Sequence, residues 1–238
     1  MSSTIDKQIA RLEPPRAATD PFAFVSPSRI GIFGSSGSGK THFLVKYLCS
    51  HGLKVYDQII WCAPAGSLQQ PKLKLLKSKW NQFCHFVEGL DEAKIEQLIQ
   101  QGFAQNPPYA TCVVIDDLML ESCKSKFVQS LWISGRHRNV TIIEMKQSIF
   151  SGGGRLARLN QEYYVLGRNG AQRDEAARLF QQLTHSKHLR EQLMTAYTRI
   201  TNRAQPGFLI IDTVSPESAG LRVRDTEMDV VIPQLASI

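Results

Sequence analysis

Short apolar runs alternate along the chain with longer segments in which apolar residues recur at helical spacing. Most of the runs are rich in β-branched residues and end in turn-forming or acidic residues, which predicts buried strands. The predicted strands are Ile30–Phe33, Val55–Cys62, Phe83–Val87, Thr111–Asp117, Val140–Met145, Glu162–Leu166 and Phe208–Asp212. The predicted helices are His42–Cys49, Lys72–Trp80, Asp91–Phe103, Lys124–Arg138, Ala171–Leu183 and Ser186–Asn202. This alternation is typical of an α/β domain whose central, mostly parallel sheet is flanked by helices.

The length of 238 residues suits one such domain with extensions at both ends. Residues 1–28 contain four prolines among scattered small polar residues, and we expect a flexible N-terminal arm there. The predicted domain covers residues 29–213. Residues 214–238 form a predicted C-terminal tail, in which the last apolar run is expected to make either a short edge strand or a docking segment.

Charge is distributed unevenly along the chain, whose formal net charge is +7. Residues 124–203 hold 14 Lys and Arg against five Asp and Glu. This basic half favours a polyanionic partner, nucleic acid first, although solvated helices rich in Arg and Lys would give the same count. No apolar stretch resembles a signal peptide or is long enough to span a bilayer. We therefore expect no membrane partner. Five cysteines without a C-x-x-C pair indicate reduced thiols, so we also expect an intracellular protein that is not secreted.

A glycine-rich segment joins the first predicted strand to the first predicted helix. Gly34–Thr41 reads G-S-S-G-S-G-K-T and matches the phosphate-binding pattern G-x-x-x-x-G-K-[ST]. The backbone N–H groups that would surround phosphate oxygens belong to Gly34, Ser35, Ser36, Gly37, Ser38 and Gly39. Lys40 would reach the β- and γ-phosphates of ATP, and the Thr41 hydroxyl would hold Mg²⁺. The alternative, an ordinary Gly/Ser loop, is disfavoured by the strand–loop–helix context.

Polar residues follow two of the predicted strands directly. Thr111–Asp117 (T-C-V-V-I-D-D) ends in two carboxylates, and Gln147 comes just after Val140–Met145. Ligands of parallel α/β sheets bind at the carboxyl ends of strands, so we expect Asp116 as a Mg²⁺ ligand and Asp117 as the base that polarises the attacking water. The alternative for the two aspartates is a simple acidic turn.

The order of these elements favours one division of the P-loop NTPases. A strand lies in sequence between the phosphate loop and Asp116, and a further strand ends at Gln147. This order is similar to that of the additional-strand, RecA-like (ASCE) division, in which Gln147 would sense the γ-phosphate. A small-molecule kinase would need an Arg-rich lid and an acceptor pocket, neither of which the sequence shows.

A more specific resemblance extends over residues ~29–183, most of the predicted domain, and four blocks carry it: G-S-S-G-S-G-K-T, V-V-I-D-D-L-M, G-R-H-R-N-V-T-I-I-E-M-K-Q-S-I-F and R-L-A-R-L-N-Q-E-Y-Y-V-L. With them the chain resembles the viral genome-packaging ATPases of the FtsK–HerA superfamily, in particular those of poxvirus-like viruses, virophages and Polinton- or adintovirus-like elements. One departure is Glu144-Met145-Lys146, which stands where the family pattern has an apolar–Thr pair before the glutamine.

The resemblance implies a homo-oligomeric ring, a pentamer or hexamer, with ATP and Mg²⁺ at each junction. Such a ring would move double-stranded DNA of any sequence into a preformed capsid, binding a capsid or vertex protein, at the virus assembly site in the host cell or in the virion. A neighbouring subunit would supply an arginine to the γ-phosphate. Arg155 is the first candidate because it follows a glycine hinge, and Arg136 and Arg138 are the second.

Two other functions of different classes stay open at this point. One is a DNA translocase or helicase of the same superfamily without a capsid role. The other is a non-motor ATP switch that changes shape to help capsid assembly. The compact size favours a packaging motor, and ATP hydrolysis measured with and without duplex DNA separates the switch from the motors.

Overall fold

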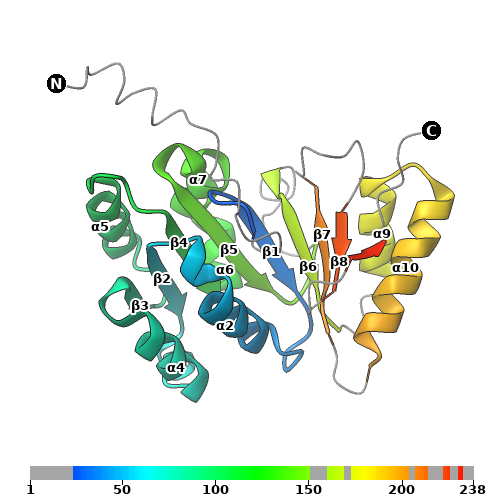
Figure 1. Ribbon diagram of the computed structural model, residues 1–238, viewed down its shortest axis with the longest axis horizontal. Coiled ribbons are helices and arrows are strands. Elements are labelled where there is room, and N and C mark those ends of the chain that lie inside the picture. The colour runs from blue at the N-terminus through cyan, green and yellow to red at the C-terminus, as the bar shows by residue number, and fades with distance from the viewer. Residues whose placement is uncertain are drawn as a thin grey trace.

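The structure, a computed structural model, describes residues 24–150, 160–168, 173–203, 207–213, 222–225 and 230–232. The strands within these ranges form a nine-stranded sheet in the order β3-β2-β4-β5-β1-β6-β7-β8-β9 (Figure 1). They are β1 (Arg29–Phe33), β2 (Gln58–Ala63), β3 (Cys84–Glu88), β4 (Thr111–Asp116), β5 (Val140–Lys146), β6 (Tyr163–Leu166), β7 (Leu209–Asp212), β8 (Arg222–Arg224) and β9 (Val230–Ile232). Pairings from β3 to β6 are parallel and those from β6 to β9 are antiparallel. The predicted fold class is confirmed.

The central strands are covered on both faces. Every residue of β2, β4 and β5 is buried. Because side chains of a strand point alternately to opposite faces, Val114 lies in the core on one side of the sheet and Val113 in the core on the other. Continuous β-branched runs in the sequence correspond to this two-sided burial.

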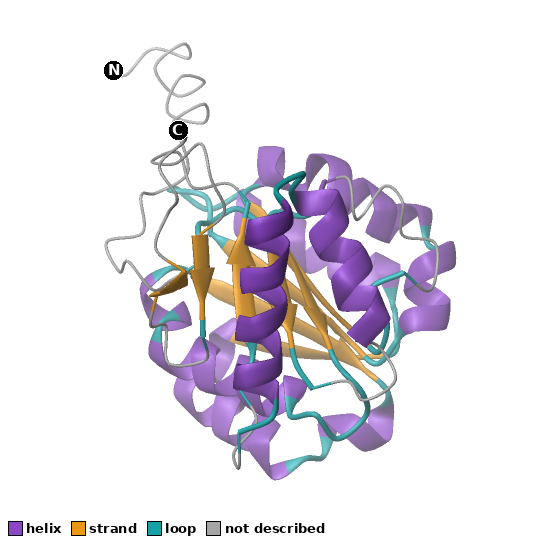
Figure 2. Cartoon of the chain, turned by 90° about the vertical axis from the view of Figure 1, so that its right-hand side faces the viewer, coloured by secondary structure: helices purple, strands orange, loops and turns teal. Residues whose placement is uncertain are grey.

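Helices form a layer on each face of the sheet (Figure 2). Helices α2 (Lys40–Ser50) and α4 (Pro71–Trp80) pack on one face, with Leu44 and Leu76 in the same core as Val114. The opposite face is covered by α5 (Glu92–Phe103), α7 (Lys126–Ser134), α9 (Arg173–Leu183) and α10 (Lys187–Thr201). The short elements are α3 (Ala65–Leu68), α6 (Met119–Lys124), η1 (Gly52–Lys54), η2 (Asn81–Phe83) and η3 (Gly135–Arg138). Across the described ranges, no helix combines the length and the apolar character that crossing a bilayer requires.

One predicted helix is wrong in its extent. Within the segment Lys124–Arg138, expected as a single helix, the α-helix α7 covers only Lys126–Ser134 and is followed by the 3₁₀ turn η3, while Lys124 is the last residue of α6. Ser125 has φ −73° and ψ 117°, and its Oγ accepts a hydrogen bond of 2.9 Å from the N–H of Val128. A serine hydroxyl at such a position caps the amino end of a helix, so a new helix begins after Ser125.

The described ends of the chain are attached to the sheet. Phe24, which falls in the predicted arm, is fully buried, with its ring centroid 4.6 Å from that of Tyr47 and 4.8 Å from that of Tyr163. Its N–H also donates to the Tyr47 hydroxyl at 2.8 Å. The packed unit therefore begins before Arg29. In the predicted tail, β8 and β9 extend the sheet, and β9 is the edge strand that the last apolar run indicated.

Candidate nucleotide-binding site

The phosphate loop lies between β1 and α2, as the sequence predicts. Gly37 has φ 75° and Gly39 has φ 90°, in the left-handed region that favours glycine. At Gly34 an added Cβ would lie 2.6 Å from the Oγ of Ser38, so the loop closes on itself too tightly for a side chain there. These glycines let the backbone turn sharply from the strand end to the start of a helix, where N–H groups and the helix dipole favour an anion.

Lys40 is folded back over this loop. Its Nζ donates to the carbonyl oxygens of Gly34 at 2.7 Å and Ser35 at 3.1 Å. Partial burial lowers the pKa of Lys40, while the nearby carboxylates of Asp116 and Asp117 act in the opposite direction. The ammonium is therefore close to both acidic residues and to the centre of the loop.

The two aspartates after β4 have different surroundings. Asp116 is buried, and its Oδ2 accepts a hydrogen bond of 3.3 Å from the Thr41 hydroxyl. Burial raises the pKa of Asp116 to about 6, helped by the charge of Asp117 and opposed by the Thr41 hydrogen bond and by Lys40. Asp117 is exposed and has φ 56°, an uncommon backbone conformation for a residue other than glycine. The turn thus keeps one carboxylate inside and presents the other to solvent.

Thr41 and Asp116 together supply a hydroxyl and a carboxylate oxygen, the hard oxygen donors that suit Mg²⁺. They come from residues 75 positions apart and meet because the helix start and the strand end lie at the same edge of the sheet. The pair fits a Mg²⁺ ion that would also contact bound phosphates, as in other P-loop NTPases.

Strand β5 lies directly between the strand of the phosphate loop and the strand of the aspartates. Phe33 of β1 is in register with Lys146, and Asp116 of β4 is in register with Met145. The Gly34 N–H donates to the Lys146 carbonyl at 3.2 Å. Gln147, the next residue, is exposed at this edge of the sheet. The three predicted parts, which are the loop, the aspartates and the glutamine, are therefore brought to one place.

Comparisons with known proteins agree with this arrangement. No protein-family model matches the chain, and no curated protein matches its sequence. Solved structures of B204, named as the genome packaging NTPase of Sulfolobus turreted icosahedral virus 2, do match it. The AMP complex has a TM-score of 0.55 at 16% identity, covering 83% of this chain and 96% of B204. The AMPPCP complex has a TM-score of 0.52 at 14% identity, covering 83% and 96%.

B204 from Sulfolobus turreted icosahedral virus, named as a DNA-packaging ATPase, matches with a TM-score of 0.54 at 15% identity, covering 83% of this chain and 97% of that one. The chain therefore shares the fold of these packaging NTPases. At such low identity the likeness is one of fold, so the roles of individual residues rest on the geometry of this chain.

Two sets of contacts that the sequence does not reveal hold the phosphate loop and the segment after Gln147 in place. They come from the residues after β6 and from α9. The Arg168 carbonyl accepts from the Ser35 N–H at 3.2 Å and from the Ser35 hydroxyl at 3.1 Å. Glu175, in the first turn of α9, accepts from the Ser148 hydroxyl at 2.6 Å and from the Ile149 N–H at 2.8 Å. The segment that follows Gln147 is therefore held against α9. The first contact uses a backbone carbonyl and the second joins distant segments, so neither has a local sequence signal.

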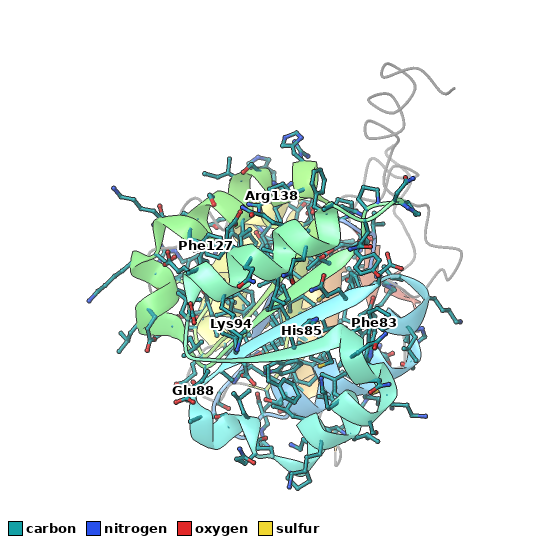
Figure 3. All side chains as sticks on the ribbon, turned by 90° about the vertical axis from the view of Figure 1, so that its left-hand side faces the viewer. Phe83, His85, Glu88, Lys94, Phe127 and Arg138 are labelled. Carbon is teal, nitrogen blue, oxygen red and sulfur yellow. The ribbon has the colours of Figure 1, made fainter. Side chains whose placement is uncertain are left out.

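Neither Arg136 nor Arg138 is brought to the candidate nucleotide site within one chain. Arg155 lies outside the described residues. Arg136 and Arg138 belong to η3, which precedes β5 and so lies at the amino ends of the parallel strands, at the edge of the sheet opposite to the phosphate loop. Arg138 makes an ion pair of 2.8 Å with Glu96 of α5, whereas Arg136 is exposed. Figure 3 shows Arg138 beyond α5, on the side away from Glu88 at the carboxyl end of β3.

Proposed function

We propose that the chain binds Mg²⁺–ATP at the phosphate loop and hydrolyses it. The observation that carries the proposal is the 3.3 Å contact between Thr41 and Asp116. Strand β5, which ends directly before Gln147, lies between β4, which ends at Asp116, and β1, which leads into the phosphate loop. Lys40 would exchange its loop carbonyls for phosphate oxygens, and Thr41 and Asp116 would hold Mg²⁺. Asp117, exposed beside them, would polarise the attacking water, and Gln147 would contact the γ-phosphate.

Two substitutions test this assignment by separating binding from turnover. Lys40→Ala should abolish ATP binding, because it removes the cation that the phosphates require. Asp117→Asn should bind ATP with unchanged affinity and lose hydrolysis, because the amide keeps the shape but cannot act as a base. Binding is measured with a fluorescent ATP analogue and turnover by phosphate release. Parental hydrolysis by Asp117→Asn would refute its role as the base.

We infer further that hydrolysis drives movement along double-stranded DNA, and that the DNA enters a preformed capsid. The naming of the B204 proteins as DNA-packaging enzymes supports this inference, as do the exposed basic side chains of the chain. Exposed basic residues lie on several elements, among them Lys187 and Arg199 of α10 and Lys72, Lys74 and Lys79 of α4. Contacts of a motor to DNA should be to phosphates, since it must pass over any sequence.

Salt dependence of duplex binding tests the DNA contact. Binding should be independent of sequence, and the logarithm of affinity should fall with the logarithm of salt with a slope of about −0.9 per phosphate contact. Two matched double variants test one helix each: Lys187→Gln/Arg199→Gln in α10 and Lys72→Gln/Lys74→Gln in α4. The pair that contacts DNA should reduce the slope by about 2 and the other should leave it unchanged. Affinity that does not change with salt would refute a groove that follows the backbone.

Packaging in particular requires a capsid. With purified chain, ATP and empty capsid shells, duplex DNA should become protected from nuclease, and the protection should be lost with Lys40→Ala. DNA-stimulated ATP hydrolysis without any protection would favour the translocase without a capsid role. Hydrolysis that DNA does not stimulate would favour the non-motor switch.

We infer that the motor is a ring in which a neighbouring subunit supplies an arginine to the γ-phosphate. Arg155 is the first candidate and Arg136 the second, since Arg138 is already bound to Glu96. An arginine supplied in this way stabilises charge that develops in the transition state, so its loss should leave ATP binding nearly intact. Arg155→Ala subunits should be inactive alone and should regain part of their hydrolysis when mixed with Lys40→Ala subunits. A mixed ring that stays inactive would exclude Arg155, and Arg136→Ala would then be mixed in the same way.

A further inference from the structure

Strand β5 carries two buried charged residues in the middle of the sheet. Glu144 is 3% exposed and Lys146 is 8% exposed, and the Lys146 Nζ lies 2.8 Å from Oε2 of Glu144. Removing two charges from water costs several kcal/mol for each ion, and an apolar pair of similar size is often as stable or more stable. Stability alone therefore does not account for an ion pair at this position.

The Glu144 carboxylate also binds two helices. Its Oε1 accepts from the Ser122 hydroxyl of α6 at 2.6 Å, and its Oε2 accepts from the Trp132 Nε1 of α7 at 3.2 Å. Helix α6 begins at Met119, two residues after Asp117. The carboxylate thus connects the strand that ends at Gln147 with the helix that leaves the Asp117 turn.

Lys146 is the other end of this connection. It directly precedes Gln147, and its carbonyl accepts the hydrogen bond from the Gly34 N–H at 3.2 Å. One residue therefore contacts the phosphate loop through its backbone and, through its side chain, the carboxylate that binds α6 and α7. All three parts of the proposed ATP site are linked through these two residues.

We propose that Glu144 and Lys146 are positioning residues, which hold Gln147 and the Asp117 turn at the correct distance from the phosphate loop for hydrolysis. This inference rests on the proposed ATPase function. It accounts for charges at a site where apolar residues would be expected. A carboxylate that accepts from three donors restricts the relative positions of β5, α6 and α7 more closely than apolar packing does. Neither residue needs to touch ATP.

The double variant Glu144→Leu/Lys146→Met tests the proposal, since it replaces the ion pair by an apolar pair of similar size. We expect a folded protein, KM for ATP within about threefold of the parent, and kcat lower by about tenfold or more, because small misplacements at a reacting centre are costly. The matched control is Arg29→Met/Glu162→Leu, which removes an ion pair of 2.6 Å at the opposite end of β1. It should change stability and leave kcat unchanged.

A double variant that is folded and hydrolyses ATP at the parental kcat would overturn the positioning role. So would a loss of ATP affinity as large as the loss of turnover. Should the double variant not fold, Ser122→Ala removes one hydrogen bond to Glu144 and keeps the ion pair, and Ser122→Thr restores the hydroxyl. We then expect reduced kcat in the alanine variant and recovery in the threonine variant, and a parental kcat in Ser122→Ala would refute the proposal. A parent chain that does not hydrolyse ATP would instead refute the proposed function.

Discussion

Replacing Asp116 by asparagine should stabilise the protein in the absence of Mg²⁺ and nucleotide. Asp116 is 6% exposed, and its burial raises the pKa of the carboxyl group from 3.8 to about 6. At neutral pH the folded chain therefore holds a carboxylate that would be better solvated in the unfolded chain. Asparagine has nearly the same shape, carries no charge and can still accept the hydrogen bond from Thr41.

The size and sign of the effect follow from the pKa shift. A difference of about two pKa units corresponds to about 3 kcal/mol. Because the folded state binds the proton more tightly, this contribution to stability is fully present below about pH 4 and is lost as the pH rises through about 6. The free energy of unfolding of Asp116→Asn should thus exceed that of the parent by about 3 kcal/mol at pH 7.5, and the difference should disappear near pH 4.

Urea denaturation in the presence of EDTA measures this difference. The free energy of unfolding is extrapolated for parent and variant at pH 7.5 and at pH 5, and the change with pH is compared. Other titrating groups cancel in the comparison, apart from Lys40 and Asp117, whose charges interact with that of Asp116. Addition of Mg²⁺–ATP should then stabilise the parent and not the variant, since a ligand stabilises only the state that binds it.

Asp117→Asn is the matched control, because it makes the same substitution at the exposed neighbouring carboxylate. It should change the free energy of unfolding little at either pH. The reasoning would be refuted if Asp116→Asn were no more stable than the parent at pH 7.5. It would also fail if the two variants shifted stability by the same amount.

Three further expectations come from the same site. Mg²⁺–ATP affinity, measured by calorimetry, should weaken as the pH falls below about 6, because the metal binds only the ionised form of Asp116. Gly39→Ala should lower the free energy of unfolding by about 1–2 kcal/mol, since alanine is strained at φ 90°, whereas Gly66→Ala in α3 should not. Glu175→Ala should reduce ATP hydrolysis by about tenfold in phosphate-release assays by freeing Ser148 and Ile149, and Asp174→Ala next to it should not.

The geometry of the proposed nucleotide site was largely predictable because its parts follow simple rules. The phosphate loop is continuous in sequence, so its strand, glycines and helix could be recognised together. Asp116 and Gln147 follow apolar runs, and the carboxyl ends of parallel strands must share an edge of the sheet. The position of β5 between β4 and β1 was not predicted and is given by the pairing of the strands.

Other features could not be predicted because they depend on tertiary contacts. The short helix α6 before Ser125 was not predicted, and the role of Ser125 as the cap of α7 becomes visible only in the folded chain. Phe24 follows a proline-rich segment, yet the pocket between Tyr47 and Tyr163 buries it. Glu144 was recognised only as a departure from a family pattern, since its partners lie 22 and 12 residues away.

The positions of the arginines restrict how a ring could be built. Within one chain η3 and the phosphate loop lie at opposite edges of the sheet, so Arg136 could serve only a site on another subunit. The amino edge of one sheet would then have to face the carboxyl edge of the next, a head-to-tail contact of the kind that closes into rings. Arg155 lies outside the described residues, so this geometry follows from Arg136 alone. Mixing Arg136→Ala subunits with Lys40→Ala subunits therefore tests the head-to-tail geometry as well as the residue.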